Sequence, residues 1–273
     1  MPLSFAALLP HGGEIVLQLT DNPALMEKTR IAMREAGRVF AEKNINTVVV
    51  LDPHADFMVE SALTIGATFH AAGILGELDR AHIKAAFEVD TEFVEALFTE
   101  ANGTLPMIRA VGADEGRNAV LPLSWGALIP LWFTAHPVTR SRPKVVIVAP
   151  ERSTPREELL AFGKLIGQVA EKSGKNVALI ASGDLGHGHD EDGPYGFAKA
   201  SAEHDLLFCE ALVDNNLAGL LPLTDEFLEE ALVDAFWQVL ILHGALLEKP
   251  MSCRLLSYEA PTYFGMAVAL FEP

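Results

Sequence analysis

Three histidines follow three short apolar runs of the sequence, each on a turn that contains proline or glycine. The pairs of run and histidine are Ser4–Leu9 with His11, Thr47–Leu51 with His54, and Val177–Ala181 with His187. Such runs are typical of buried strands, and the carboxyl ends of parallel strands meet at one edge of a sheet, where ligand sites form. Imidazole binds Zn, Fe, Cu or Ni. The pattern predicts that the three side chains converge on one site, whereas a single histidine in such a place is more often a loop residue.

Strands and helices alternate along the chain, and these elements must position the histidines. Two more strands are predicted at Val145–Ala149 and Gly265–Phe271. Helices are predicted from Asn22 to Lys43, from Ser153 to Ser173, from Phe197 to Val213 and from Thr224 to Glu248, with helical patches between Asp79 and Glu100. The alternation predicts an α/β fold: a single layered domain with a central, largely parallel or mixed sheet flanked by helices.

The composition is acidic and half apolar. Of 273 residues, 37 are Asp or Glu and 20 are Lys or Arg, which gives a formal net charge of −17. This charge repels phosphate groups and anionic lipid, so we expect neither nucleic acid nor a membrane as partner. The longest apolar stretch, Leu121–Ala135, is too short to span a bilayer and contains two prolines. Two cysteines without a CxxC motif, and no signal peptide, lead us to expect a cytoplasmic protein.

Six short motifs occur in one order along nearly the whole chain. They are Pro10-His11-Gly12-Gly13, Asp52-Pro53-His54-Ala55-Asp56, Leu121-Pro122-Leu123-Ser124-Trp125-Gly126, Ser182-Gly183-Asp184-Leu185-Gly186-His187, Gly193-Pro194-Tyr195-Gly196-Phe197 and Leu256-Ser257-Tyr258-Glu259-Ala260-Pro261. The ordered set resembles the class III extradiol ring-cleavage dioxygenases, a superfamily that includes the beta subunit of protocatechuate 4,5-dioxygenase and the Memo-like proteins. The resemblance implies a class III extradiol dioxygenase-like catalytic domain over residues 1–273.

The resemblance also implies a cofactor and a reaction. Members hold non-haem Fe(II) with two histidines and one carboxylate, and they open a catechol-type or aminophenol-type ring with O2. By resemblance His11 and His54 are metal ligands, with Zn or Mn as alternative occupants of the site. His187 matches the catalytic histidine, which moves protons without binding the metal. Its side chain suits this role because an unperturbed imidazole has a pKa of about 6.5.

The third metal ligand has three candidates. Asp234 lies nearest the family's ligand position, and on a helix it would share an inward-facing stripe with apolar neighbours. Glu230 lies one turn earlier on the same face, and Glu259 lies close to the carboxyl-terminal strand. The alternative for Asp234 is an ion pair with a nearby arginine or lysine.

Four further residues are candidates for the surroundings of the site. Trp125 stands where many relatives carry a histidine that handles substrate; it could stack on an aromatic substrate, or mark a changed substrate range or lost catalysis. Tyr195 is expected to border the substrate pocket. Asp56 and Asp184 are expected to orient the histidines as hydrogen-bond acceptors, unless they only cap turns.

The leading hypothesis is an extradiol dioxygenase whose partners are a small aromatic diol and O2. The alternatives are a Zn hydrolase that uses the same pocket, and a Memo-like or partner subunit that binds metal without turnover. By analogy with relatives, a homodimer or a pairing with a second subunit is expected. A substrate carboxylate would require a cationic clamp, for which the candidates are Arg109, Arg117, Arg140 and Arg142, with surface roles as the alternative.

Overall fold

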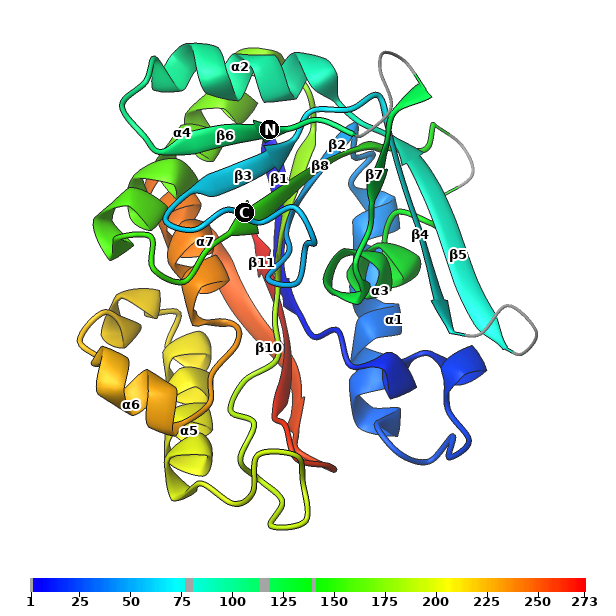
Figure 1. The fold of residues 1–273 in the computed structure, drawn as a ribbon, viewed down its shortest axis with the longest axis vertical. Helices are drawn as coiled ribbons and strands as arrows, with labels where there is room; N and C mark the ends of the chain where they lie inside the picture. Colours follow the sequence, from blue (N-terminus) through cyan, green and yellow to red (C-terminus); the bar gives the residue numbers. More distant parts are fainter. Residues whose placement is uncertain (1, 77–80, 113–117, 139–140) are drawn as a thin grey trace.

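Strands and helices succeed one another along the chain (Figure 1), but they alternate less regularly than the sequence predicts, because several strands that were not predicted follow each other directly. The computed structural model describes residues 2–76, 81–112, 118–138 and 141–273. Its strands are β1 (Leu3–Leu9), β2 (Thr47–Leu51), β3 (Leu63–Gly66), β4 (His70–Gly76), β5 (His82–Glu88), β6 (Met107–Ala110), β7 (Val120–Pro122), β8 (Lys144–Pro150), β9 (Val177–Ser182), β10 (Ser252–Glu259) and β11 (Met266–Glu272). Its α-helices are α1 (Glu27–Glu42), α2 (Thr91–Ala101), α3 (Trp125–Phe133), α4 (Arg156–Ser173), α5 (Lys199–Val213), α6 (Asp225–Glu230) and α7 (Phe236–Glu248).

A mixed eight-stranded sheet forms the centre of the molecule, in the order β10-β11-β1-β9-β2-β8-β3-β6. The four middle strands, β1, β9, β2 and β8, are parallel neighbours, and the antiparallel pairs lie toward the edges. Figure 1 shows α1 and α3 on one side of this sheet and α4 and α7 on the other. Because both faces are covered, the middle strands consist of apolar and β-branched residues, and the fold class predicted from the sequence is confirmed.

The region between Asp79 and Glu100 differs from the helical prediction. Asp79 lies outside the described residues, and His82–Glu88 forms the strand β5 in a separate three-stranded sheet of order β5-β4-β7. Burial alternates along β5, which is the period-two pattern of a half-buried strand. The helix α2 starts only after Asp90, whose side chain accepts a hydrogen bond from the Phe93 amide and so caps the first turn.

Two helix boundaries also differ from the prediction. The first helix begins at Glu27 and not after Asn22, because Met26 has a left-handed φ of 56° and residues 23–26 form a turn. The single helix predicted from Thr224 to Glu248 is broken into α6 and α7 by residues 231–235, where Leu232 has a φ of 53°. This break places Asp234 on a loop. No helix in the described part of the chain is long and apolar enough to cross a membrane.

Candidate metal centre

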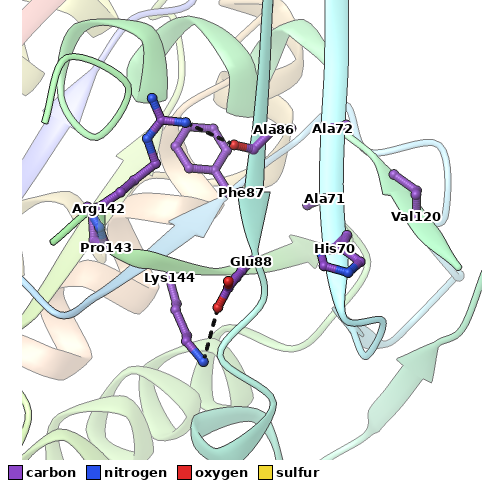
Figure 2. Close-up of a pocket in the computed structure, with 10 residues that line it drawn as sticks. All are labelled: His70, Ala71, Ala72, Ala86, Phe87, Glu88, Val120, Arg142, Pro143 and Lys144. Atoms are coloured by element: carbon purple, nitrogen blue, oxygen red, sulfur yellow. Dashed lines mark hydrogen bonds and ion pairs between the residues drawn. The ribbon is translucent and has the colours of Figure 1, made fainter. Parts of the chain in front are cut away.

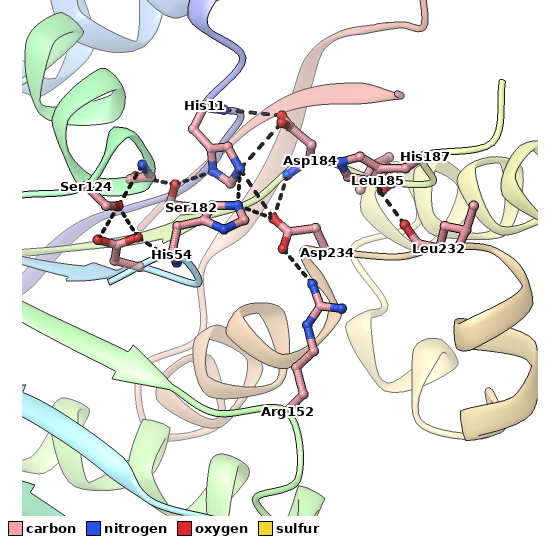
Figure 3. A network of polar contacts seen from close by, with 12 residues as sticks. His11, His54, Ser124, Arg152, Ser182, Asp184, Leu185, His187, Leu232 and Asp234 are labelled. Atoms are coloured by element: carbon pink, nitrogen blue, oxygen red, sulfur yellow. Dashed lines mark hydrogen bonds and ion pairs between the residues drawn. The ribbon is translucent and has the colours of Figure 1, made fainter. Parts of the chain in front are cut away.

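Two histidines meet at the carboxyl edge of the parallel strands. His11 follows β1 and His54 follows β2, and β9 lies between these two strands in the sheet. The Nε2 atoms of the two imidazoles are 3.0 Å apart, and Oδ2 of Asp234 lies 3.4 Å and 3.9 Å from them (Figure 3). The three side chains thus offer one ligand atom each within 4.8 Å of one another, a set that can hold a metal ion.

Hydrogen bonds select the nitrogen that His11 presents. Its Nδ1 lies 2.9 Å from Oγ of Ser182, the last residue of β9. The Ser182 hydroxyl donates its own hydrogen to the carbonyl oxygen of Gly126 at 2.5 Å, so Oγ accepts from His11. Nδ1 therefore carries the hydrogen, and in the neutral ring Nε2 keeps a free lone pair directed at His54 and Asp234.

Two contacts fix the position of Asp234, one to its carboxylate and one to the loop that carries it. Its Oδ1 accepts a hydrogen bond from Nη2 of Arg152 at 3.0 Å, and Oδ2 remains on the side of the histidines. The Asp234 loop comes close because Gly183 has no side chain: a Cβ there would lie 2.6 Å from both Cα and Cβ of Ala235. The sequence left two interpretations of Asp234 open, a metal ligand and an ion pair with an arginine. The geometry is compatible with both at once, because Oδ1 pairs with Arg152 while Oδ2 faces the histidines.

The other two candidates for the third ligand lie away from the histidines. Glu230 is exposed near the end of α6. The carboxylate of Glu259 accepts hydrogen bonds from the amide and hydroxyl of Thr29, at 2.7 Å and 2.6 Å, and so binds the first turns of α1. Of the three carboxylates, the structure brings Asp234 to the histidines.

Burial keeps both imidazoles neutral. It lowers the pKa of His11 to about 4, against a smaller opposing effect of Asp234, and it also lowers the pKa of His54. A neutral imidazole is the form that binds metal, so both rings are ready to act as ligands near neutral pH. Burial and the charge of Asp234 raise the pKa of Asp184 well above its usual range.

His187 lies beside this centre with a defined tautomer. Its Nδ1 lies 2.9 Å from the carbonyl oxygen of Leu185 and 3.0 Å from that of Leu232 (Figure 3). Carbonyl oxygens only accept hydrogen bonds, so Nδ1 carries the hydrogen and Nε2 is free to accept a proton. Burial lowers the pKa of His187, which favours this neutral form.

Aromatic rings surround His187. The ring of Phe264 is stacked on it with centroids 5.7 Å apart, and the centroids of Tyr195 and Tyr263 lie at 6.0 Å and 5.9 Å. Tyr195 is 61% exposed, so it borders the solvent side of this aromatic group. Tyr263 and Phe264 were not singled out from the sequence, although only Thr262 separates them from the Leu256–Pro261 motif.

Trp125 covers His54. Its ring is stacked on that of His54, with centroids 4.5 Å apart and an interplanar angle of 24°, and the residue is 45% exposed. It is the first residue of α3, whose N-cap Ser124 also donates a hydrogen bond to Asp52. Because the residue is partly exposed, its indole also presents aromatic surface to solvent beside His54.

The acceptors that orient the histidines differ in part from those expected. Asp184 accepts a hydrogen bond from the backbone amide of His11 at 3.2 Å. Asp56 is exposed, and it is the buried Asp52 that accepts from the His54 amide at 3.0 Å. Burial raises the pKa of Asp52 to about 6, against the opposing hydrogen bonds from Ser124 and His54. Sequence reasoning missed Asp52 and Ser182, although both belong to the motifs that contain the histidines.

Of the four arginines considered as substrate clamps, the two that the structure describes, Arg109 and Arg142, lie away from the centre. Arg117 and Arg140 lie outside the described residues, and Arg109 pairs with Glu95. Arg142 lines a pocket of about 720 Å³ over β4 and β5, which none of the three metal-site residues lines (Figure 2). The arginine at the centre is Arg152, which the sequence pattern does not distinguish from the others.

Comparisons with known proteins show the family and the fold of the chain. Over 276 aligned residues the chain is 25% identical to Protein CA_C1420 of Clostridium acetobutylicum; the alignment covers the whole chain but only 58% of that longer protein. A crystal structure of the uncharacterized protein JW3007 from Escherichia coli K12 shares the fold, with a TM-score of 0.57 at 14% identity, covering 98% of this chain and 99% of that one. Residues 5–270 match the family model described as the catalytic LigB subunit of aromatic ring-opening dioxygenase. The chain therefore belongs to this LigB family.

Proposed function

We propose that the chain is a non-haem Fe(II)-dependent extradiol dioxygenase that opens a catechol-type or aminophenol-type ring with O2. The observation that carries this proposal is the meeting of two imidazole Nε2 atoms and one carboxylate oxygen beside a third, separately held histidine. In this proposal residues 1–273 form one catalytic domain. Family membership supports ring-opening chemistry. The set of two imidazoles and one carboxylate supports the use of a metal ion in that chemistry.

The donor set fits Fe(II). Two histidines and one carboxylate on one side of an ion, with the remaining positions open, are the usual ligands of non-haem Fe(II) oxygenases. The ion, when bound, supplies a Lewis-acidic and redox-active centre at which a diol and O2 can meet. His11, His54 and Asp234 would hold it, and Zn or Mn are alternative occupants because the same donors suit them.

His187 would transfer protons in this reaction. Its Nε2 has a free lone pair, because two carbonyl oxygens hold the hydrogen on Nδ1. It can therefore accept a proton from a ring hydroxyl and return it to the product oxygen. The faces of Trp125 and Tyr195 would flank an aromatic ring placed between His54 and His187.

One observation favours a second candidate, a metal-binding subunit without turnover. By the resemblance, Trp125 stands at a position that is histidine in many class III extradiol dioxygenases, and an indole has no basic nitrogen with which to exchange protons. Trp125 stacks on His54. Among the described residues, His187 is then the one histidine beside the three-donor set that is not itself a member of the set.

Anaerobic reconstitution with Fe(II), followed by O2 uptake, tests the proposal. Catechol, 3,4-dihydroxybenzoate and 2-aminophenol are suitable probes, and ring opening gives a coloured product in step with O2 uptake. Stoichiometric Fe(II) binding without O2 uptake on any probe would favour the non-catalytic subunit. Ester hydrolysis by the Zn-loaded protein would favour the hydrolase. Light scattering on the same sample distinguishes a homodimer from a monomer that needs a second subunit.

A further inference from the structure

The loop that carries His187 rests on one face of α5. The amide of Gly188 donates a hydrogen bond to Oγ of Ser201 at 2.9 Å, and the amide of Gly186 donates to Oδ1 of Asp205 at 2.8 Å. Ser201 and Asp205 are four residues apart on the helix and therefore share a face. Two side chains of α5 thus hold the two residues on either side of His187.

The loop lies directly against the helix. A Cβ on Gly186 would lie 2.7 Å from Cβ and 2.8 Å from Cα of Ser201, so only glycine permits this approach. Two backbone hydrogen bonds also tie this loop to Gly265. The Gly265 amide donates to the carbonyl oxygen of Gly186 at 2.9 Å, and the Leu185 amide donates to the carbonyl oxygen of Gly265 at 2.7 Å. These contacts leave the loop little freedom to shift.

Asp205 is a buried carboxylate with four donors. Besides Gly186, it accepts from Tyr258 and His189 on Oδ2, each at 2.8 Å, and lies 3.0 Å from Nδ1 of His204. Burial raises its pKa, but the hydrogen bonds from His189, His204 and Gly186 outweigh this effect and lower the pKa overall. A buried charge is costly unless it is paired and hydrogen-bonded, and four donors on one carboxylate favour a single geometry of the groups around it.

Ser201 also reaches the loop that carries Asp234. Its hydroxyl donates to the carbonyl oxygen of Ala231 at 2.8 Å, and the next residue, Leu232, accepts the hydrogen bond from Nδ1 of His187. Leu232, whose carbonyl oxygen accepts this bond, has a φ of 53°, a left-handed conformation that is unfavourable for leucine. One hydroxyl therefore links the loop of the proton-transfer histidine to the loop of the carboxylate.

We propose that Ser201 and Asp205 are positioning residues: they hold the imidazole of His187 in place relative to Asp234 without contacting the metal or the substrate. The proposal rests on the proposed function in so far as His187 transfers protons. Asp234 itself keeps independent anchors, because Arg152 holds its carboxylate and the amide of Ala235 donates to the carbonyl oxygen of Asp184 at 2.9 Å.

The test is kinetic and uses Ser201→Ala in the Fe(II)-loaded protein, with catechol and O2. Misplacing an imidazole by about 1 Å is expected to lower kcat by about 10- to 100-fold. KM for catechol and the Fe(II) dissociation constant should stay within about threefold of wild type, since the atoms that bind metal do not move. Asp205→Asn, which keeps the shape but not the charge, should show the same split between kcat and KM.

Ser257→Ala is the matched control. Ser257 is buried on β10, and its hydroxyl has no hydrogen-bond partner among the residues that the structure describes. This variant should leave kcat, KM and Fe(II) binding unchanged. A kcat in Ser201→Ala equal to that of Ser257→Ala, or a loss of Fe(II) binding in place of a loss of kcat, would overturn the proposal.

Amide hydrogen exchange in the Zn-loaded protein provides a measurement that needs no turnover. Ser201→Ala should raise the exchange rate of the Gly188 amide by at least about tenfold, while amides of β1 remain as in wild type. If the wild type opens no ring, the proposed function fails while this measurement still decides the positioning. Unchanged protection of Gly188 would show that Ser201 does not hold the loop.

Discussion

At the candidate metal centre, hydrogen bonds to backbone and hydroxyl groups decide which nitrogen His11 and His187 present. Ser182 holds the hydrogen of His11 on Nδ1, and two carbonyl oxygens hold that of His187 on the corresponding atom. The two rings therefore present the same nitrogen, Nε2, in different surroundings. His11 lies within reach of the other two metal-binding donors, whereas His187 lies among aromatic rings.

Ser182→Ala should weaken metal binding by about 10- to 100-fold, the usual effect of removing a group that orients a ligand histidine. The variant also leaves Nδ1 of His11 and the Gly126 carbonyl without this partner, which costs about 1–3 kcal/mol of stability. A competition titration with a chromophoric chelator measures the affinity, and Ser257→Ala is the control. Wild-type affinity in a folded Ser182→Ala protein would refute the orienting role.

His187→Gln should retain Fe(II) with wild-type affinity and lose turnover. General acid–base groups contribute about 10²- to 10⁴-fold, so kcat should fall within that range. The exposed His70 on β4 allows a matched control, His70→Gln, which should alter neither quantity. If His187→Gln loses its metal, His187 is a ligand and the assignment of roles is wrong.

At the scale of elements, the centre depends on loops that pack closely across the carboxyl edge of the sheet. The turn after β9 touches the break between α6 and α7, and this contact brings Asp234 to the histidines that follow β1 and β2. The break replaces part of a helix with a loop whose residues are mostly buried. Small residues at the contact therefore help to build the candidate metal site, although they offer no ligand atom themselves.

Gly183→Ala should displace the Asp234 loop, because the new Cβ would lie 2.6 Å from Cα of Ala235. Such overpacking costs about 1–3 kcal/mol, and the affinity for Fe(II) should fall with the displacement of the carboxylate. Thermal unfolding and metal titration check the two effects. Gly13→Ala is the control, since a Cβ there meets nothing within 4 Å; equal metal affinity in both variants would contradict the argument.

At the scale of the whole molecule, the buried carboxylate of Asp90 joins distant parts of the fold away from the candidate metal centre. Asp90 accepts hydrogen bonds from Thr47 of β2 at 2.5 Å, from the Phe93 amide at the start of α2, and from Lys175 before β9. Burial raises its pKa, but the bonds from Lys175, Thr47 and Phe93 outweigh this effect, so the pKa is lowered overall.

This lowered pKa predicts how stability depends on pH. A carboxyl whose pKa is lower in the folded state stabilises the protein above its unfolded pKa of about 3.9, and this contribution is lost as pH falls through the folded value. Asp90→Asn should therefore lower the melting temperature at pH 7, and the difference in stability between variant and wild type should shrink near pH 3. A constant difference across that range, measured by thermal unfolding, would contradict the assigned role.

Local patterns in the sequence determined five of the eight strands of the central sheet, β1, β2, β8, β9 and β11, and the two strand-end histidines; β3, β6 and β10 were not predicted. Runs such as Thr47–Leu51 are strands because apolar, β-branched residues suit a position covered on both faces, and this depends on neighbours in the sequence. The Pro- and Gly-bearing turns after these strands are equally local. For that reason the sequence by itself places His11 and His54 at one edge of the sheet.

Tertiary structure alone decided how the site is completed. Residues 231–235 carry no helix-breaking residue, and they leave the helix because long-range contacts with Gly183, Ser201 and His187 stabilise the left-handed Leu232. Arg152 meets Asp234 across 82 residues, and Ser182 meets His11 across 171. Such partners are set by packing between distant segments, which periodicity and turn signals along the chain do not encode.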